Sequence, residues 1–226
     1  MYSNRNGFIA LGLALALLGG SAGCASMSKT SSGAIIGAAA GGIAGGVIGN
    51  QVGSTTKGAI IGAVVGGAAG AIIGRQMDQQ ARELEQKIPG ATVQRVGEGI
   101  AVTFASGLLF DFDSDVILGS ARSNLNQLAS SLDKYPNTSL IIVGHTDAVG
   151  TADYNHDLSL RRSAAAARYL ASRGVSRTIA TRGMGETDPV ATNDTEAGRQ
   201  QNRRVEVAIY ASEAFAAEAR RQAGVQ

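Results

Sequence analysis

Alternation of apolar and polar residues is clearest in the C-terminal half of the chain. It predicts a β-hairpin over residues 92–104, with a Gly-Glu-Gly turn at its centre. Three short apolar runs predict further strands, over residues 139–143, 179–182 and 205–210. Apolar residues at helical spacing predict two helices, over residues 118–134 and 154–172. The order is β-α-β-α-β-β, which predicts an α+β sandwich with its helices on one face of a sheet.

The N-terminal segment, up to Cys24, carries a different pattern. Arg5 precedes an apolar run from Phe8 to Leu18, and small residues follow it, an arrangement typical of an export signal. A short transmembrane anchor or a buried helix is the alternative. The run is too short to cross a ~30 Å hydrocarbon core comfortably, so we expect residues 1–23 to be a signal peptide.

An internal repeat lies between these two regions. Residues 33–51 align with residues 58–76, so that Gly33 matches Gly58, and 13 of 19 aligned positions are identical. Glycine recurs at every fourth position, which places a glycine groove along one face of a helix. Each glycine costs a helix in water about 1 kcal/mol relative to alanine, whereas in lipid small residues let two helices approach closely. The repeat therefore predicts an α-helical hairpin over residues 33–76, which resembles the glycine-zipper families.

Membrane insertion of this hairpin is left open. As a helix each repeat is roughly 28 Å long, close to the thickness of the hydrocarbon core. If Cys24 and the C-terminal half are both on the periplasmic side, the chain crosses the bilayer twice or not at all. A flexible Gly/Ala linker is the alternative, although the regular glycine spacing argues against it.

Three further segments complete the organisation of the chain. Residues 77–90 are polar with apolar residues at helical spacing, which predicts a stem helix ended by Pro89 and Gly90. Residues 91–211 have the composition of a globular domain. Residues 212–226 are expected to be a tail that forms a short exposed helix, to which the sequence assigns no role.

Cys24 is the one cysteine in the chain, and an unpaired cysteine in an exported protein needs an explanation. Ala22-Gly23-Cys24 resembles a bacterial lipobox, which implies that Cys24 is acylated and begins the mature protein, with 24–32 as a lipid-anchored linker. Ser21 departs from the leucine that the lipobox family prefers, and an unmodified cysteine is the alternative. Ala25 is not the aspartate of an inner-membrane retention signal, which favours the outer membrane of a Gram-negative bacterium, with the C-terminal domain in the periplasm.

Five motifs follow one another in the C-terminal half: Phe110–Asp113, Gly144–Gly150, Tyr154–Arg162, Gly183–Val190 and Gly198–Val205. Together they resemble the OmpA-like peptidoglycan-binding domain, which is also found in the Pal lipoprotein and in flagellar stator proteins. With the lipobox and the glycine repeat, the whole chain resembles the YiaD-type outer-membrane lipoproteins. The resemblance implies that peptidoglycan is a partner, bound through the diaminopimelate of its stem peptide.

Asp147 and Arg162 match the two main ligand residues of this family. The free end of diaminopimelate carries an ammonium and a carboxylate on one carbon. A carboxylate such as Asp147 accepts hydrogen bonds from the ammonium, and the guanidinium of Arg162 can hold the carboxylate with two parallel hydrogen bonds. Without the resemblance, Asp147 would be an ordinary turn residue and Arg162 an ordinary surface charge.

Four secondary positions match the lining of the family's pocket: Asp113, Thr146, Asn155 and Arg203. Asn155 could instead cap the helix that follows it. Arg203 and its neighbour Arg204 could contact ligand or brace the last strand. Of Phe110 and Phe112, one could flank the ligand, and core packing is equally expected.

Other classes of function have weak support. His145, Asp147 and Ser159 supply the residue types of a hydrolytic triad, but Ser159 does not stand in a Gly-x-Ser-x-Gly motif, so we expect no enzyme. His145 and His156 are a weak metal pair, and neither a metal nor a cofactor is expected. The net charge of +2 and the absence of a basic patch with interleaved aromatics argue against nucleic-acid binding.

Two functional hypotheses remain. In the first, acyl chains at Cys24 hold the protein on outer-membrane lipid, and the C-terminal domain binds peptidoglycan noncovalently, which tethers the membrane to the wall. In the second, the glycine-zipper helices form a homo-oligomer that acts as a pore or assembly scaffold, and wall binding only positions it. The repeat has no ionisable residue of the kind that a proton-driven stator needs inside the membrane.

Overall fold

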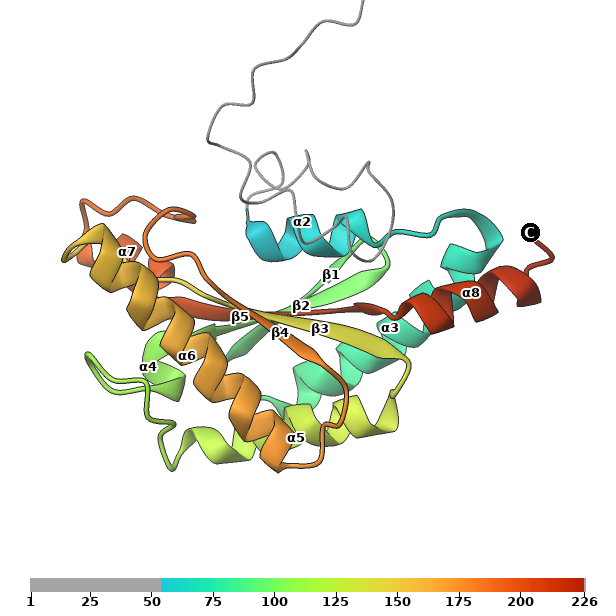
Figure 1. Ribbon diagram of the computed structural model, residues 1–226, viewed down its shortest axis with the longest axis horizontal. Coiled ribbons are helices and arrows are strands. Elements are labelled where there is room, and N and C mark those ends of the chain that lie inside the picture. Colours follow the sequence, from blue (N-terminus) through green and yellow to red (C-terminus); the bar gives the residue numbers. More distant parts are fainter. Residues whose placement is uncertain (1–53, 226) are drawn as a thin grey trace, which may run out of the picture.

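Five strands form one mixed sheet at the centre of the protein (Figure 1). The computed structural model describes residues 54–225, so the signal peptide, Cys24 and the first glycine repeat lie outside the described residues. The strands are β1 (Ala91–Val96), β2 (Gly99–Ala105), β3 (Thr138–Gly144), β4 (Ile179–Gly183) and β5 (Arg204–Ala211). Their order across the sheet is β1-β2-β5-β3-β4. The predicted α+β class and all the predicted strands are confirmed.

The helices connect and cover this sheet. They are α2 (Thr55–Gly62), α3 (Gly67–Lys87), α4 (Ser106–Leu109), α5 (Ala121–Lys134), α6 (Ala152–Ser172), α7 (Glu196–Asn202) and α8 (Glu213–Gln222). The two helices predicted after the hairpin correspond to α5 and α6. The pattern did not predict the short helices α4 and α7, because neither is long enough to show an apolar period.

Pairing within the sheet places the loops that carry the motifs. β3 runs antiparallel to β5 and parallel to β4, and the connection from β3 to β4 passes through α6. Gly144 ends β3 directly against α6: a Cβ at Gly144 would lie 2.1 Å from the carbonyl oxygen of Ser159. Glycine therefore lets the end of this strand approach the helix closely.

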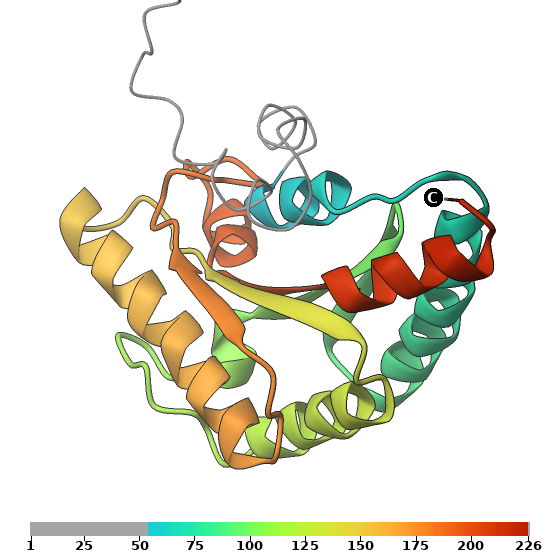
Figure 2. The same ribbon diagram turned by 45° about the vertical axis from the view of Figure 1, so that its right-hand side comes forward.

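The main core lies between the sheet and helices α3, α5 and α6 (Figure 2). Met77 and Leu84 from α3 pack there with Leu128 from α5 and Leu170 from α6, and all four are 0–1% exposed. Burying an aliphatic side chain of this size contributes about 1.5–3 kcal/mol. This face of the fold therefore supplies most of the apolar contact.

The opposite face of the sheet is covered in part by α2. Ala59 and Ile60 pack against Ala101, Ile141 and Ala208 from the strands below. The two predicted helices of the domain, α5 and α6, do share one face, and α2 is an additional helix on the other. The physical reason is that α2 presents an Ala-Ile pair, which a sheet face of small and β-branched residues can bury.

The second glycine repeat differs from the single helix that its periodicity predicts. It divides into α2 and the start of α3, and the turn between them has φ of 73° at Gly66 and 62° at Gly67. Glu98, from the β1–β2 turn, accepts hydrogen bonds from the backbone N–H of Val65 and Gly66, at 2.7 and 2.8 Å. A carboxylate at the start of α3 is also favoured by the helix dipole, so this contact stabilises the break.

The C-terminal tail is not simply exposed. α8 packs along α3 (Figures 1 and 2), and its Ala219 is fully buried in the main core. The stem helix begins earlier than expected, since α3 runs unbroken from Gly67 to Lys87. Within residues 54–225, no helix has the length and apolar character needed to cross a membrane.

Candidate functional site

A cavity of about 420 Å³ brings together all six ligand residues that the sequence predicts. They come from four parts of the fold: the loop after α4, the loop after β3, helix α6 and the turn between α7 and β5. In that order the residues are Asp113; Thr146 and Asp147; Asn155 and Arg162; and Arg203. Four separate motifs are thus gathered at one end of the sheet.

Asp147 is paired with a basic residue of the cavity wall. Its Oδ2 lies 2.5 Å from Nη1 of Arg203, and its Oδ1 accepts a hydrogen bond from the N–H of Val149 at 3.0 Å. The residue is 7% exposed. Its carboxylate is therefore held in one orientation, and Arg203 contacts the cavity and not only the last strand.

Arg162 is held by backbone carbonyls. Its Nε donates to the carbonyl oxygen of Ser114 at 2.9 Å, its Nη2 donates to that of Asp111 at 3.4 Å, and its guanidinium stacks 5.5 Å from the ring centroid of Phe110. Burial lowers the pKa of Arg162, while the charges of Asp113 and Asp115 oppose that shift. Among the described residues no carboxylate forms an ion pair with it. The cavity thus contains a fixed cation that lacks a paired anion.

Asn155 supports the cavity wall and does not cap its helix. Its side-chain amide donates to the backbone carbonyl of Asp147 at 3.3 Å and to Oε2 of Glu186 at 2.7 Å. The cap of α6 is Thr151, whose hydroxyl accepts from the N–H of Tyr154. Asn155 therefore ties the loop after β3 to the first turn of α6.

Asp113 and Thr146 differ in how they are held. Asp113 is the one described residue other than glycine with a left-handed φ, of 54°, and its carboxylate accepts a hydrogen bond from the hydroxyl of Tyr154. Thr146 is 5% exposed, and its hydroxyl has no hydrogen-bond partner among the described residues. Thr146 thus has an unused donor and acceptor at the cavity wall. Of the two phenylalanines, Phe110 packs in the core, whereas Phe112 lines the cavity and is 98% exposed.

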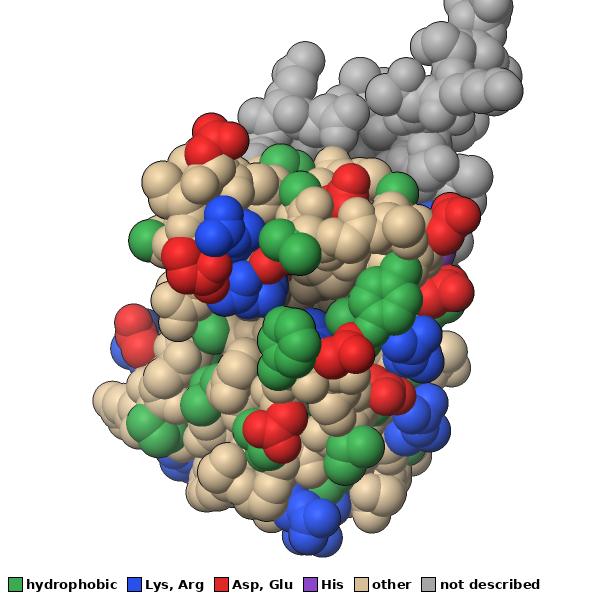
Figure 3. Space-filling view, turned by 90° about the vertical axis from the view of Figure 1, so that its left-hand side faces the viewer, with side chains coloured by type: hydrophobic (Ala, Val, Ile, Leu, Met, Phe, Trp, Pro, Cys, Tyr) green, Lys and Arg blue, Asp and Glu red, His purple; other side chains and the backbone are tan. Residues whose placement is uncertain are grey.

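Glu196 and Arg199, both on α7, line the cavity without having been predicted. Glu196 pairs with Arg203 at 2.6 Å and with Arg199 at 2.8 Å, and these two cations hold its pKa below the usual range. The lining then has three carboxylates and three guanidinium groups. Figure 3 shows acidic and basic side chains mixed on this side of the molecule, with hydrophobic side chains among them. A balanced lining suits a ligand that carries both charges.

The residue types of a hydrolytic triad are separated. The Ser159 hydroxyl donates to the carbonyl of His156 at 2.7 Å. His145 is fully buried, with its ring nitrogens 3.9 Å from a carboxylate oxygen of Asp188 and 4.0 Å from one of Glu206. The ring therefore belongs to a buried charged cluster, and it does not activate the serine.

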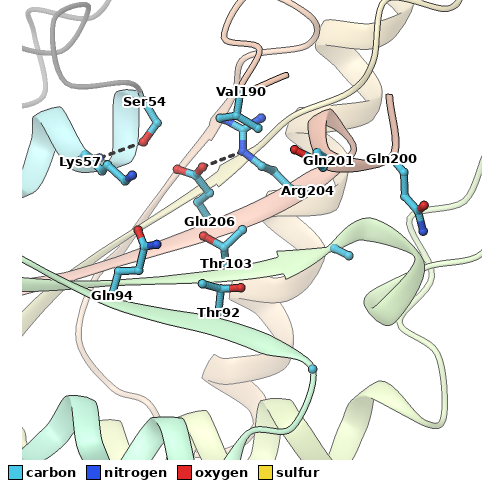
Figure 4. Close-up of a pocket in the computed structure, with 12 residues that line it drawn as sticks. Ser54, Lys57, Thr92, Gln94, Thr103, Val190, Gln200, Gln201, Arg204 and Glu206 are labelled. Carbon is cyan, nitrogen blue, oxygen red and sulfur yellow. Dashed lines mark hydrogen bonds and ion pairs between the residues drawn. The ribbon is translucent and has the colours of Figure 1, made fainter. Parts of the chain in front are cut away.

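Arg204 belongs to this same cluster. It pairs with Glu206 at 2.7 Å, and both side chains are almost fully buried. They lie at the edge of a second, polar cavity of about 390 Å³ beside α2, where Lys57 and Gln94 also point (Figure 4). The two neighbouring arginines thus differ in role: Arg203 lines the charged cavity, and Arg204 braces β5.

Comparison with known proteins gives two family matches. The model of the OmpA family matches residues 109–203, and that of the YMGG-like Gly-zipper matches residues 1–78. The first match includes every predicted ligand residue, and the second includes Cys24 and both glycine repeats.

Individual relatives agree with these matches. The chain is 35% identical over 136 residues to the probable lipoprotein YiaD of Escherichia coli K12, covering 59% of this chain and 62% of that protein. It therefore spans less than two thirds of that relative. It is 38% identical over 116 residues to the peptidoglycan-associated lipoprotein of Brucella melitensis, covering 51% of this chain and 69% of that protein. A solved MotB-like protein from Desulfovibrio vulgaris has the same fold, with a TM-score of 0.57 and 22% identity over 63% of this chain and 96% of that one.

Proposed function

Because this chain belongs to the OmpA family, we propose that it is an outer-membrane lipoprotein whose domain binds peptidoglycan. The ligand group is the free end of diaminopimelate in the stem peptide. Acylated Cys24 anchors the chain to outer-membrane lipid, and the domain lies in the periplasm. The protein thereby tethers the membrane to the wall.

The charges of the cavity suggest how the ligand binds. The ammonium of diaminopimelate donates to Asp147 and shares that carboxylate with Arg203. The ligand carboxylate lies against the guanidinium of Arg162, which has donors for a planar anion. The hydroxyl of Thr146 is available to either group. No bond is made or broken, so binding is reversible.

One observation carries this proposal: six residues chosen from four motifs line a single cavity of balanced charge. The names of two relatives support it, since one is a probable lipoprotein and the other a peptidoglycan-associated lipoprotein. The position of α2 favours a tether over a pore, because the start of the second repeat is packed on the domain.

Pull-down with purified sacculi tests the site. Asp147→Ala and Arg162→Ala should each reduce the bound fraction at least tenfold, because each leaves one charge of the ligand unpaired. Arg162→Lys should also bind poorly, since lysine lacks the planar fork. Asp157→Asn and Arg161→Lys are matched controls, because both residues are exposed on α6 and neither lines the cavity. Wild-type binding by both alanine variants would exclude this site.

A further inference from the structure

The sheet surface beneath α2 makes specific demands on the segment that covers it. We call this surface the α2 seat and define it by Gly99, Ala101, Ile141, Val143 and Ala208. Ile60 is 1% exposed there, and a Cβ on Gly99 would lie 2.4 Å from its Cγ2 atom. The seat therefore fits an isoleucine closely at one position of the helix.

At both ends of the seat, a carboxylate accepts hydrogen bonds from backbone N–H groups of the segment that covers it. At the first end, the N–H of Thr55 donates to Asp188 at 2.8 Å, and the hydroxyl of Ser54 caps α2 by accepting from the N–H of Lys57 at 3.2 Å. At the other end, Glu98 accepts from the turn between α2 and α3. The occupant therefore needs a helix followed by a break at a fixed distance.

The break requires glycine at two positions and leaves little room for a side chain at a third. Gly66 and Gly67 have left-handed φ, which glycine adopts without strain. At Gly70, a Cβ would lie 2.0 Å from a carboxylate oxygen of Glu98. The seat thus selects an Ala-Ile pair followed by glycines at the sixth, seventh and tenth positions after the isoleucine.

The first repeat carries every one of these residues. In the alignment of the two repeats, Ala34 and Ile35 correspond to the buried pair, and Gly41, Gly42 and Gly45 correspond to Gly66, Gly67 and Gly70. We propose that the α2 seat has two alternative occupants within one chain: the second repeat, which fills it in the structure, and the first repeat. Exchange moves the point at which the chain enters the domain from the second repeat to the first.

One difference between the repeats sets their order of preference. The residue that corresponds to the cap Ser54 is Lys29, which cannot accept a hydrogen bond from the first turn. The second repeat therefore occupies the seat at rest. Exchange leaves the core part of α3 in place, because the displaced residues form a loop ahead of it, and the entropy of closing a loop grows only slowly with its length.

Chemical crosslinking of the full-length chain tests this exchange. In a Cys24→Ala background, Gln94→Cys is combined with either Lys57→Cys or Ser32→Cys, the equivalent position of the first repeat. Lys57 and Gln94 line the same cavity beside α2 (Figure 4). A short bismaleimide should link residues 57 and 94 in most molecules and residues 32 and 94 in few. Absence of the link between residues 57 and 94 would contradict the packing of α2 on the seat, and with it the proposal.

Exchanging the caps should reverse this preference. With Lys29→Ser and Ser54→Lys together, the 32–94 link should become the major product and the 57–94 link the minor one. Ile60→Asp should have the same effect more strongly, and adding Ile35→Asp should abolish both links. Circular dichroism of each variant checks that the sheet still folds. An unchanged ratio after the cap exchange, or a 32–94 link that joins two chains, would refute exchange within one chain.

Discussion

At the scale of single residues, the two main charges of the cavity are held in different ways. Asp147 is neutralised by Arg203, so a ligand ammonium must share it, whereas Arg162 is fixed by carbonyl groups and keeps its charge for an incoming anion. An ion pair exchanged for another contributes less free energy than one formed anew. We infer that the anionic end of the ligand contributes more to affinity than its ammonium.

His145 gives this domain a dependence on pH. Burial lowers its pKa to about 4, with the charge of Arg204 acting in the same direction and Glu206 and Asp188 opposing it. An unfolded histidine titrates near 6.5. The unfolded state therefore takes up a proton first, and the free energy of unfolding should fall as pH drops from about 6.5 to about 4, by up to about 3 kcal/mol.

Urea unfolding at pH 7.5 and pH 5 checks this effect. His145→Gln keeps a polar side chain of similar reach without titrating, so its stability should change much less between the two pH values. Burial raises the pKa of Glu206, but the charge of Arg204 holds that pKa below the usual range. Protonation of Glu206 therefore lowers the free energy of unfolding only at lower pH. Equal pH dependence in wild type and variant would contradict the role of His145.

The sequence identified six residues of the cavity because they stand in recognisable motifs. It did not identify Glu196 and Arg199, since charges on a short polar helix look like solvated surface until the fold brings α7 to the cavity. Nor did the sequence show which of Arg203 and Arg204 lines the cavity. Adjacent residues at the start of a strand point to opposite sides, and only the pairing of β5 decides which side faces the cavity.

At the scale of elements, alternation predicted the first hairpin, apolar runs predicted the remaining strands, and helical spacing predicted the two main helices. The runs are continuous in β3 and β5 because these central strands are buried on both faces. The second repeat was harder to predict. Its glycine spacing is compatible with one long helix, and the residue that breaks this helix, Glu98, lies more than 30 positions away in the β1–β2 turn. A contact so distant in sequence leaves no local pattern.

Removing this contact should loosen the break. Glu98→Ala leaves the N–H groups of Val65 and Gly66 without their acceptor, at a cost of about 1–3 kcal/mol. Amide hydrogen exchange at these two residues should become at least tenfold faster, while exchange in β3 stays unchanged. Glu85→Ala is the matched control, since Glu85 is exposed on α3. If both variants exchange alike, Glu98 does not hold the turn.

At the scale of the whole molecule, the proposed anchor and the cavity belong to separate parts of the chain. Cys24 precedes the described residues, and the cavity is built from residues 112–203. At the other end of the chain, the C-terminal helix α8 packs on α3 and so belongs to the same domain. Anchoring and binding should therefore be separable by mutation.

Cys24→Ala tests this separation. The variant should lack the mass of the acyl groups and leave the membrane fraction, but it should bind purified sacculi as well as the wild type does. Mass determination of the mature protein and a sacculus pull-down measure the two properties independently. A wild-type chain of unmodified mass would contradict acylation, and loss of sacculus binding in the variant would contradict independence of the two parts.

The place where the chain enters the domain also determines where a mechanical load would act. A pull from the N-terminal end reaches α2 before any strand, and α2 rests on the sheet mainly through Ala59 and Ile60. Peeling residues 54–66 away would release a segment roughly 40 Å long when extended, at about 3.4 Å per residue. The cavity lies beyond α3, on elements that this pull does not load first. Under tension, α2 would thus detach from the sheet first, while the rest of the domain stayed folded and bound to the ligand.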